Sequence, residues 1–86
     1  MLILVIYYVY MLKCKSVRTV TYVGYTNNLK RRINLHNSGK GAKFTRGRKW
    51  RLIYKEKFKS KIEAISREYY IKKNRSLRKK IIEKNK

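Results

Sequence analysis

Arg32 is the residue whose position points most directly to chemistry. Four residues at positions i, i+3, i+4 and i+7 share one face of a predicted helix: Leu29, Arg32, Ile33 and His36. A buried charge without a partner is strongly destabilising, so an arginine on an apolar helix face is expected only where that face borders a cleft. A guanidinium in a cleft pairs well with a carboxylate or a phosphate. Arg32 is therefore predicted to bind an anion.

The net charge indicates which kind of anion to expect. The chain has 25 lysines and arginines against 4 acidic residues, a net charge of +21. A field of this size attracts polyanions, and nucleic acid is its natural complement; a merely soluble basic surface is the alternative. The charges are spread along the whole chain, which argues against a basic amphipathic helix on a membrane. The basic connection 39–49 is predicted to touch phosphates through Lys40, Lys43, Arg46, Arg48 and Lys49.

Length and cysteine content exclude several other classes. A chain of 86 residues is expected to form a single domain, 1–86, because it is too short to fill two cores. Cys14 is the only cysteine, which excludes an intrachain disulfide and a cysteine-rich zinc site. The apolar stretch 1–12 is too short to span a bilayer and carries no cleavage signal, so it is expected to be a buried strand. A cytoplasmic location is the corresponding expectation.

These residues must be positioned by a small set of strands and helices. Segments 2–13 and 17–25 are rich in β-branched and aromatic residues and are predicted to form an antiparallel hairpin that turns near Ser16. With that turn, Tyr10 lies opposite Tyr22 on one face of the sheet. Asn27 or Asn28 is expected to cap the helix from Leu29 to about His36.

The second half of the chain predicts one more strand and two helices. Residues 51–58 alternate as a third strand, and Ser60 with Glu63 forms a capping box that opens a long helix. That helix is expected to turn Ile62, Ile65 and Tyr69 inward, with Glu68 at the margin. A last helix is expected from Ser76, with Leu77 and Ile81 as its apolar pair. The predicted fold is α+β, a three-stranded antiparallel sheet flanked by helices in the order β-β-α-loop-β-α-α.

Four features then occur in a fixed order: Tyr8-Val9-Tyr10, Tyr22-Val23-Gly24, Arg32 ten residues after Tyr22, and Glu68. Together they resemble the GIY-YIG nuclease superfamily, whose name describes the first two features, although Tyr8 stands where the name has glycine. The chain is most similar to the small stand-alone bacterial members, in segments 28–32, 36–39, 41–47 and 67–69. The resemblance covers about residues 7 to 75, and the ordered set is far more specific than any one motif.

The resemblance implies metal-assisted hydrolysis of a phosphodiester bond. Glu68 would hold one divalent ion, Mg²⁺ or Mn²⁺, and Arg32 would bind the phosphate under attack. Tyr10 and Tyr22 would position or deprotonate the water, and His36 would assist proton transfer. Such chemistry independently needs a guanidinium, a metal ion and a carboxylate, because negative charge develops on the phosphoryl oxygens. A tyrosine with a pKa near 10 becomes a useful base only where nearby cations lower that value.

Several alternatives stay open at this stage. Tyr10 and Tyr22 alone would suit sheet packing, His36 would suit packing at a helix end, and Glu68 could pair with Lys72 at i+4. The preferred function is a DNA endonuclease of low sequence specificity, in repair, recombination or mobile-element biology, with DNA favoured over RNA. A non-catalytic nucleic-acid-binding module of the same fold is the second hypothesis. A ribosome-associated basic protein is the third, and it leaves the ordered motifs unexplained.

Overall fold

The order of strands and helices is the predicted one. The computed structural model describes residues 4–15 and 20–85. Three strands form one antiparallel sheet in the order β2-β1-β3, which confirms the α+β class. The elements are β1 (Tyr7–Cys14), β2 (Thr21–Thr26), α1 (Leu29–Asn37), the short 3₁₀ helix η1 (Lys43–Thr45), β3 (Trp50–Phe58), α2 (Lys61–Lys73) and α3 (Arg75–Lys84).

The central strand β1 is buried on both faces. Val9 and Met11 belong to an apolar cluster that includes residues of α2 and α3, whereas Tyr10 and Leu12 belong to a second cluster against which α1 packs. A strand covered on both faces has a continuous apolar sequence rather than an alternating one, which accounts for the opening run. The run is longer than the strand, however, because residues 4–6 precede β1 and residues 1–3 lie outside the described part.

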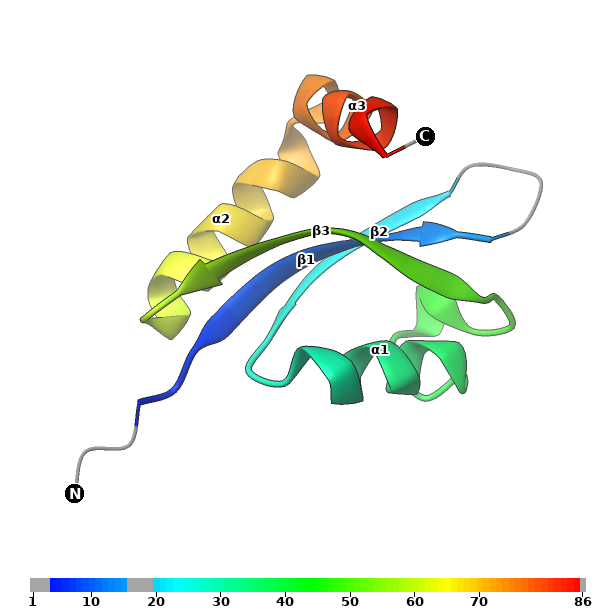
Figure 1. The fold of residues 1–86 in the computed structure, drawn as a ribbon, viewed down its shortest axis with the longest axis horizontal. Helices are drawn as coiled ribbons and strands as arrows, with labels where there is room; N and C mark the ends of the chain where they lie inside the picture. The colour runs from blue at the N-terminus through cyan, green and yellow to red at the C-terminus, as the bar shows by residue number, and fades with distance from the viewer. Residues whose placement is uncertain (1–3, 16–19, 86) are drawn as a thin grey trace.

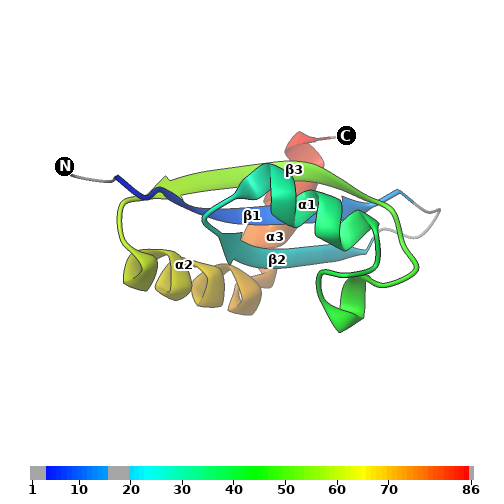
Figure 2. The same cartoon turned by 90° about the horizontal axis from the view of Figure 1, so that it is seen from below.

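The helices lie in two layers on opposite faces of the sheet (Figure 1). Helix α1 and η1 cover one face, and α2 and α3 cover the other. Both α2 and η1 extend past the β2 edge, as the view from below shows (Figure 2). The edge strand β2 therefore runs between the two layers. No helix in the described residues is long and apolar enough to cross a membrane.

The predicted register of the hairpin was wrong by two residues. Tyr10 pairs with Gly24, and Tyr22 pairs with Leu12. The expected turn near Ser16 lies outside the described residues. Side chains alternate between the two faces of a strand, so a shift of two residues leaves Tyr10 and Tyr22 on the same face. Their ring centroids are 6.4 Å apart, diagonal to one another rather than directly opposite.

Polar caps begin the helices at the expected places. The Asn28 side chain accepts a hydrogen bond from the Arg31 backbone N–H at 3.1 Å, and Ser60 accepts one from the Glu63 N–H at 3.2 Å. Asn74 caps α3 by accepting from the Leu77 N–H. These local bonds satisfy backbone donors that the helices leave unpaired, which is why capping residues can be read from sequence.

The rotation of α2 about its axis differs from the expected one. Ile62, Ile65 and Tyr69 are 80%, 42% and 58% exposed, whereas Ala64 and Ile71 are buried against the sheet. Arg67, on the same side as Ala64 and Ile71, makes a bidentate ion pair with Glu56 on β3. The small Ala64 side chain allows the helix to approach the sheet, and the ion pair helps to fix its rotation. The prediction of Ile62, Ile65 and Tyr69 as the inward face was wrong.

This rotation gives a stability test. Ile71→Ala should lower the free energy of unfolding by about 2–5 kcal/mol, because it leaves a cavity among buried side chains. Ile62→Ala removes an exposed side chain of the same type and should change stability by about 0.5 kcal/mol or less. Urea denaturation of both variants measures the difference. Equal losses would contradict the observed orientation of α2.

Candidate active site

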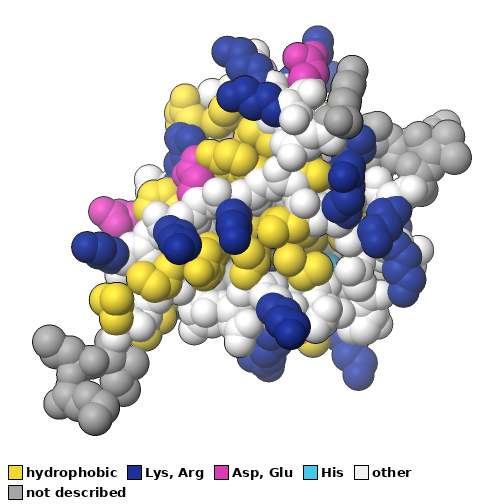
Figure 3. Space-filling view, viewed as in Figure 1, with side chains coloured by type: hydrophobic (Ala, Val, Ile, Leu, Met, Phe, Trp, Pro, Cys, Tyr) yellow, Lys and Arg dark blue, Asp and Glu magenta, His cyan; other side chains and the backbone are white. Residues whose placement is uncertain are grey.

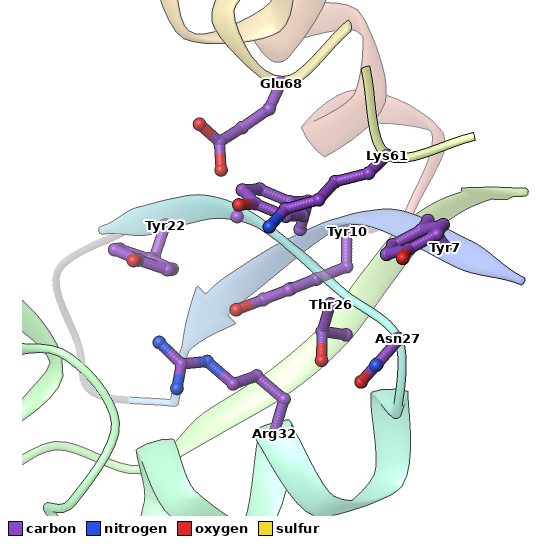
Figure 4. A pocket seen from close by; sticks show the side chains of 10 residues that line it. Tyr7, Tyr10, Tyr22, Thr26, Asn27, Arg32, Lys61 and Glu68 are labelled. Carbon is purple, nitrogen blue, oxygen red and sulfur yellow. The ribbon is translucent and has the colours of Figure 1, made fainter. Parts of the chain in front are cut away.

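A cleft of about 470 Å³ brings together the predicted chemical residues. Tyr10 and Tyr22 enter it from the sheet, Arg32 from α1 and Glu68 from α2 (Figure 4). Segments far apart in the sequence therefore meet between the two helical layers. His36 does not line the cleft. It lies behind Tyr10, fully buried.

Arg32 carries a charge that the described residues do not neutralise. Its side chain is half-buried in the cleft, and neither of the two ion pairs among the described residues involves it. The helix face that carries it is the predicted one, because Leu29 and Ile33 pack against the buried cluster of Tyr10. A half-buried guanidinium without a carboxylate partner favours binding of an anion.

A buried chain of hydrogen bonds joins Tyr10, His36 and Thr45. Tyr10 Oη lies 2.7 Å from His36 Nε2, and His36 Nδ1 lies 2.9 Å from Thr45 Oγ1. The Thr45 hydroxyl donates its one hydrogen to the Ala42 carbonyl and accepts from the Ala42 N–H. It can therefore only accept from His36, which places the imidazole hydrogen on Nδ1. Neutral His36 then has a free lone pair on Nε2, and Tyr10 donates to it.

The pKa values of both residues reflect burial. Burial raises the pKa of Tyr10 to about 12, although the nearby Arg32 acts in the opposite direction. The expectation that the positive surroundings would lower a tyrosine pKa is therefore wrong for Tyr10, because desolvation of the phenolate dominates. Burial also lowers the pKa of His36 below its ordinary value of 6.5, and the charge of Arg32 acts in the same direction. The resting pair is a neutral phenol and a neutral imidazole.

Two glycines provide the space that this chain of hydrogen bonds needs. A Cβ atom at Gly24 would lie 2.6 Å from Tyr10 Oη, and one at Gly41 would lie 2.4 Å from His36 Nδ1. Both distances are too short for any side chain. The glycine of the Tyr22-Val23-Gly24 motif is thus explained by the tyrosine ring on the neighbouring strand.

Glu68 is the carboxylate that lines the cleft. Glu56 is committed to Arg67 and to the Tyr54 hydroxyl, and despite burial these bonds lower the pKa of its carboxyl. Neither Glu63 nor Glu83 lines the cleft. The alternative pairing of Glu68 with Lys72 is present, at 3.3 Å. Lys72 is half-exposed, however, and ion pairs of this kind contribute only about 0–1 kcal/mol, so a metal ion could displace the lysine.

The donor set fits a hard divalent cation that keeps most of its water. In the described residues no three His, Cys, Asp or Glu side chains gather into a metal-binding group. One carboxylate in an open polar cleft is nevertheless sufficient for Mg²⁺ or Mn²⁺, since such ions are often bound by one or two carboxylates together with waters and substrate phosphates. The ion would then bind more tightly with nucleic acid present than alone.

The predicted phosphate contacts of the connection 39–49 lie away from this cleft. None of its five basic side chains lines it: Lys40, Lys43, Arg46, Arg48 and Lys49. The connection instead supports the site from behind, because Thr45 is buried against His36 and the Thr45 carbonyl accepts from the Trp50 indole at 3.0 Å. Phe44, considered as a residue that could pack inward, is 52% exposed and stacks on Tyr22.

Sequence reasoning missed two residues of the site. Thr45 is a polar residue in a basic loop, and only its position behind His36 reveals its function. Lys61 lines the cleft from the first residue of α2, opposite Arg32 (Figure 4). Its place at the start of a capped helix was readable, but the rotation of that helix was not.

The fold and the cleft define a nuclease family. Residues 6–81 match the GIY-YIG catalytic domain, so the chain belongs to that family. Its members are endonucleases that act on nucleic acids and generally depend on a divalent metal ion.

The relatives are small bacterial proteins. The chain is 60% identical to the UPF0213 protein CPE1444 of Clostridium perfringens over 67 residues, which cover 77% of this chain and 70% of that protein. It is 47% identical to the UPF0213 protein YazA of Bacillus subtilis over 68 residues, covering 78% and 67%. The solution NMR structure of the UPF0213 protein BH0048 from Bacillus halodurans superposes with a TM-score of 0.52 at 44% identity, covering 91% of this chain and 83% of that one.

The hydrogen-bond chain predicts the effect of changing Thr45. Thr45→Val keeps the shape but removes the acceptor of the His36 Nδ1–H, and an unsatisfied buried donor costs about 1–3 kcal/mol. Thr45→Ser keeps the hydroxyl. We expect Val, but not Ser, to shift the imidazole away from the Nδ1–H tautomer, measured by ¹⁵N chemical shifts. An unchanged tautomer in Thr45→Val would contradict the assigned direction of these bonds.

Proposed function

We propose that this protein is a divalent-metal-dependent endonuclease that hydrolyses DNA phosphodiester bonds with low sequence specificity. The observation that carries the proposal is the meeting of Arg32, Glu68 and the Tyr10–His36 pair at one cleft. Each of the three supplies something that hydrolysis needs: an anion site, a metal ligand and a proton acceptor. A module that only binds DNA needs neither a buried proton path nor a carboxylate facing the phosphate.

Tyr10 and His36 act together as the base. The attacking water gives one proton to Tyr10 Oη as Tyr10 passes its own proton to His36 Nε2. The water oxygen then forms a bond to phosphorus, the bond to the bridging oxygen breaks, and that oxygen takes up a proton from solvent. Because the proton leaves Tyr10 as another arrives, a free phenolate with its raised pKa never has to form. Tyr22, beside both residues, helps to orient the water.

Binding of the phosphate makes His36 a better base. In the free protein the charge of Arg32 lowers the pKa of the imidazole. A phosphate paired with Arg32 offsets that charge, so the imidazolium formed during proton transfer becomes easier to hold. Thr45 keeps the ring in the orientation that presents Nε2 to Tyr10. Substrate binding and base strength are therefore coupled through one guanidinium.

Glu68 is the residue that would hold Mg²⁺ or Mn²⁺. A divalent ion there supplies Lewis-acid stabilisation of the charge that builds up on the phosphoryl oxygens. Arg32 and Lys61 add positive charge from opposite sides of the same cleft. Recognition is directed at the phosphate backbone, which carries no sequence information, and this accounts for the low specificity. The basic connection 39–49 contacts backbone outside the cleft through Lys40, Lys43, Arg46, Arg48 and Lys49.

Removing the Glu68 charge should separate binding from cleavage. Glu68→Gln should bind DNA at least as tightly as the unaltered protein, because a negative charge is lost, and should not cut it with Mg²⁺ or Mn²⁺. Glu83→Gln makes the same change in charge outside the cleft and should keep full activity. The measurement is cleavage of labelled linear, nicked and branched DNA, with metal and with EDTA. Metal-dependent cutting by clean Glu68→Gln protein would overturn the assigned site.

Arg32→Ala should lose nearly all cleavage and part of the binding. The guanidinium holds the phosphate in the ground state and in the transition state alike, so both affinity and rate depend on it. Arg31→Ala removes an equal charge from the exposed neighbouring position and should affect cleavage little. Filter binding and single-turnover cleavage measure the two effects. Equal losses for the two variants would show that the charge alone matters and that the position of Arg32 does not.

The pH dependence should report on His36. The imidazole must be neutral to accept a proton, and its folded pKa lies below 6.5. The cleavage rate should therefore hold as the pH falls to 6.5 and should drop only at lower pH, when the buried ring becomes protonated. Tyr10→Phe should slow cleavage by about 10²–10⁴-fold and lose this dependence, because the proton path is interrupted. A Tyr10→Phe variant with the rate and pH profile of the unaltered protein would refute the relay.

A further inference from the structure

The cleft continues beyond the site over the edge of the sheet. Tyr22 lines both the cleft and a neighbouring hollow of about 360 Å³, where Lys72 and Arg78 also lie. That hollow shares Thr21 and Arg78 with a third one, of about 660 Å³. The three hollows therefore form one continuous track across strand β2. The two outer hollows together are called the α3 groove.

The α3 groove is lined by basic residues alone among its charged groups. Lys72 and Arg78 border its inner part, Arg75 and Lys79 its outer part, and no acidic residue lines either. The basic side chains of the connection 39–49 line none of the three hollows. On a surface as basic as this one, charge does not select a path for a polyanion. The continuity of the α3 groove with the cleft does select one (Figure 3).

The outer residues of the α3 groove are available to a ligand. Arg75 and Lys79 are exposed, stand four residues apart on α3, and make no ion pair with any described residue. Arg78 is already held, because its guanidinium donates to the carbonyls of Ile71 and Lys72 at the end of α2. Its charge is thereby fixed within the groove. The exposed ring of Phe44, stacked on Tyr22, forms an apolar wall where the groove leaves the cleft.

We propose that the nucleic-acid strand that enters the cleft continues over β2 and along α3, with Arg75 and Lys79 on phosphates beyond the one that is cleaved. The inference rests on the proposed function for the identity of the ligand, since the same backbone must fill both sites. It differs from the prediction that the connection 39–49 makes the main phosphate contacts. Binding along the α3 groove does not require cleavage, so the two can be tested separately.

Two charge-matched variants on one helix test the path. Arg75→Gln/Lys79→Gln neutralises the groove face, and Lys80→Gln/Lys84→Gln neutralises exposed positions at the same spacing outside the groove. Fluorescence anisotropy in EDTA measures affinity for a DNA oligonucleotide of about 20 nucleotides across a salt series. Each lost phosphate contact should reduce the slope of log K against log salt by about 0.7 for single strands and 0.9 for duplex. The groove variant should thus lose about 1.4–1.8, and the control variant much less.

A short oligonucleotide adds a second measure. A DNA of about three nucleotides, long enough only for the cleft, should bind both variants alike, so the defect should grow with length. Equal loss of slope in the two variants, or none in the groove variant, overturns the proposed path. Retained cleavage by the unaltered protein with no groove effect refutes the path alone. A groove effect in a protein that never cleaves refutes the proposed function and leaves the path standing. Thermal unfolding of both variants excludes loss of the fold as the cause.

Discussion

The fully buried imidazole of His36 is the constraint on which the rest of the site depends. A buried ring needs a partner for each nitrogen, because an unsatisfied polar group in the interior is strongly destabilising. Tyr10 on β1 and Thr45 in η1 provide those partners, so the sheet, α1 and the basic connection are tied together by two hydrogen bonds. Gly24 and Gly41 follow from the same requirement, since any side chain at either position would collide with one of the bonded groups.

The charge of the molecule has a local structure that the total of +21 conceals. Three carboxylates lie outside the cleft, one of them held by Arg67, and only Glu68 lines it. Arg32 and Lys61 line the same cleft, so the balance of side-chain charge there is positive. Such an arrangement destabilises the free protein slightly through desolvation and repulsion, and an anionic ligand relieves it. The stability of the fold and the affinity for a polyanion are therefore linked at this site.

Much of the fold could be predicted because short-range rules determined it. Asn28, Ser60 and Asn74 cap helices by bonds to backbone N–H groups three residues away, and such bonds need no distant partner. The apolar stretch around Val9 indicated a buried strand for the same reason. The rotation of α2 could not be predicted, because it depends on how Ala64 and Ile71 pack on a sheet made by other parts of the chain. Isoleucines at suitable spacing were available on two sides of that helix, and the helix sequence alone does not choose between them.

The sequence by itself determined the order of the elements, the family to which the ordered motifs belong, and the residues from which a site could be built. It determined these because residue type, capping and period are local properties, and because a motif keeps its order whatever the fold does. Only the tertiary structure decided the register that sets Tyr10 beside Gly24, the burial that raises the pKa of Tyr10, and the tautomer of His36 that makes it an acceptor. Each of these depends on contacts between residues distant in the chain, where packing and desolvation rather than local propensity set the energies.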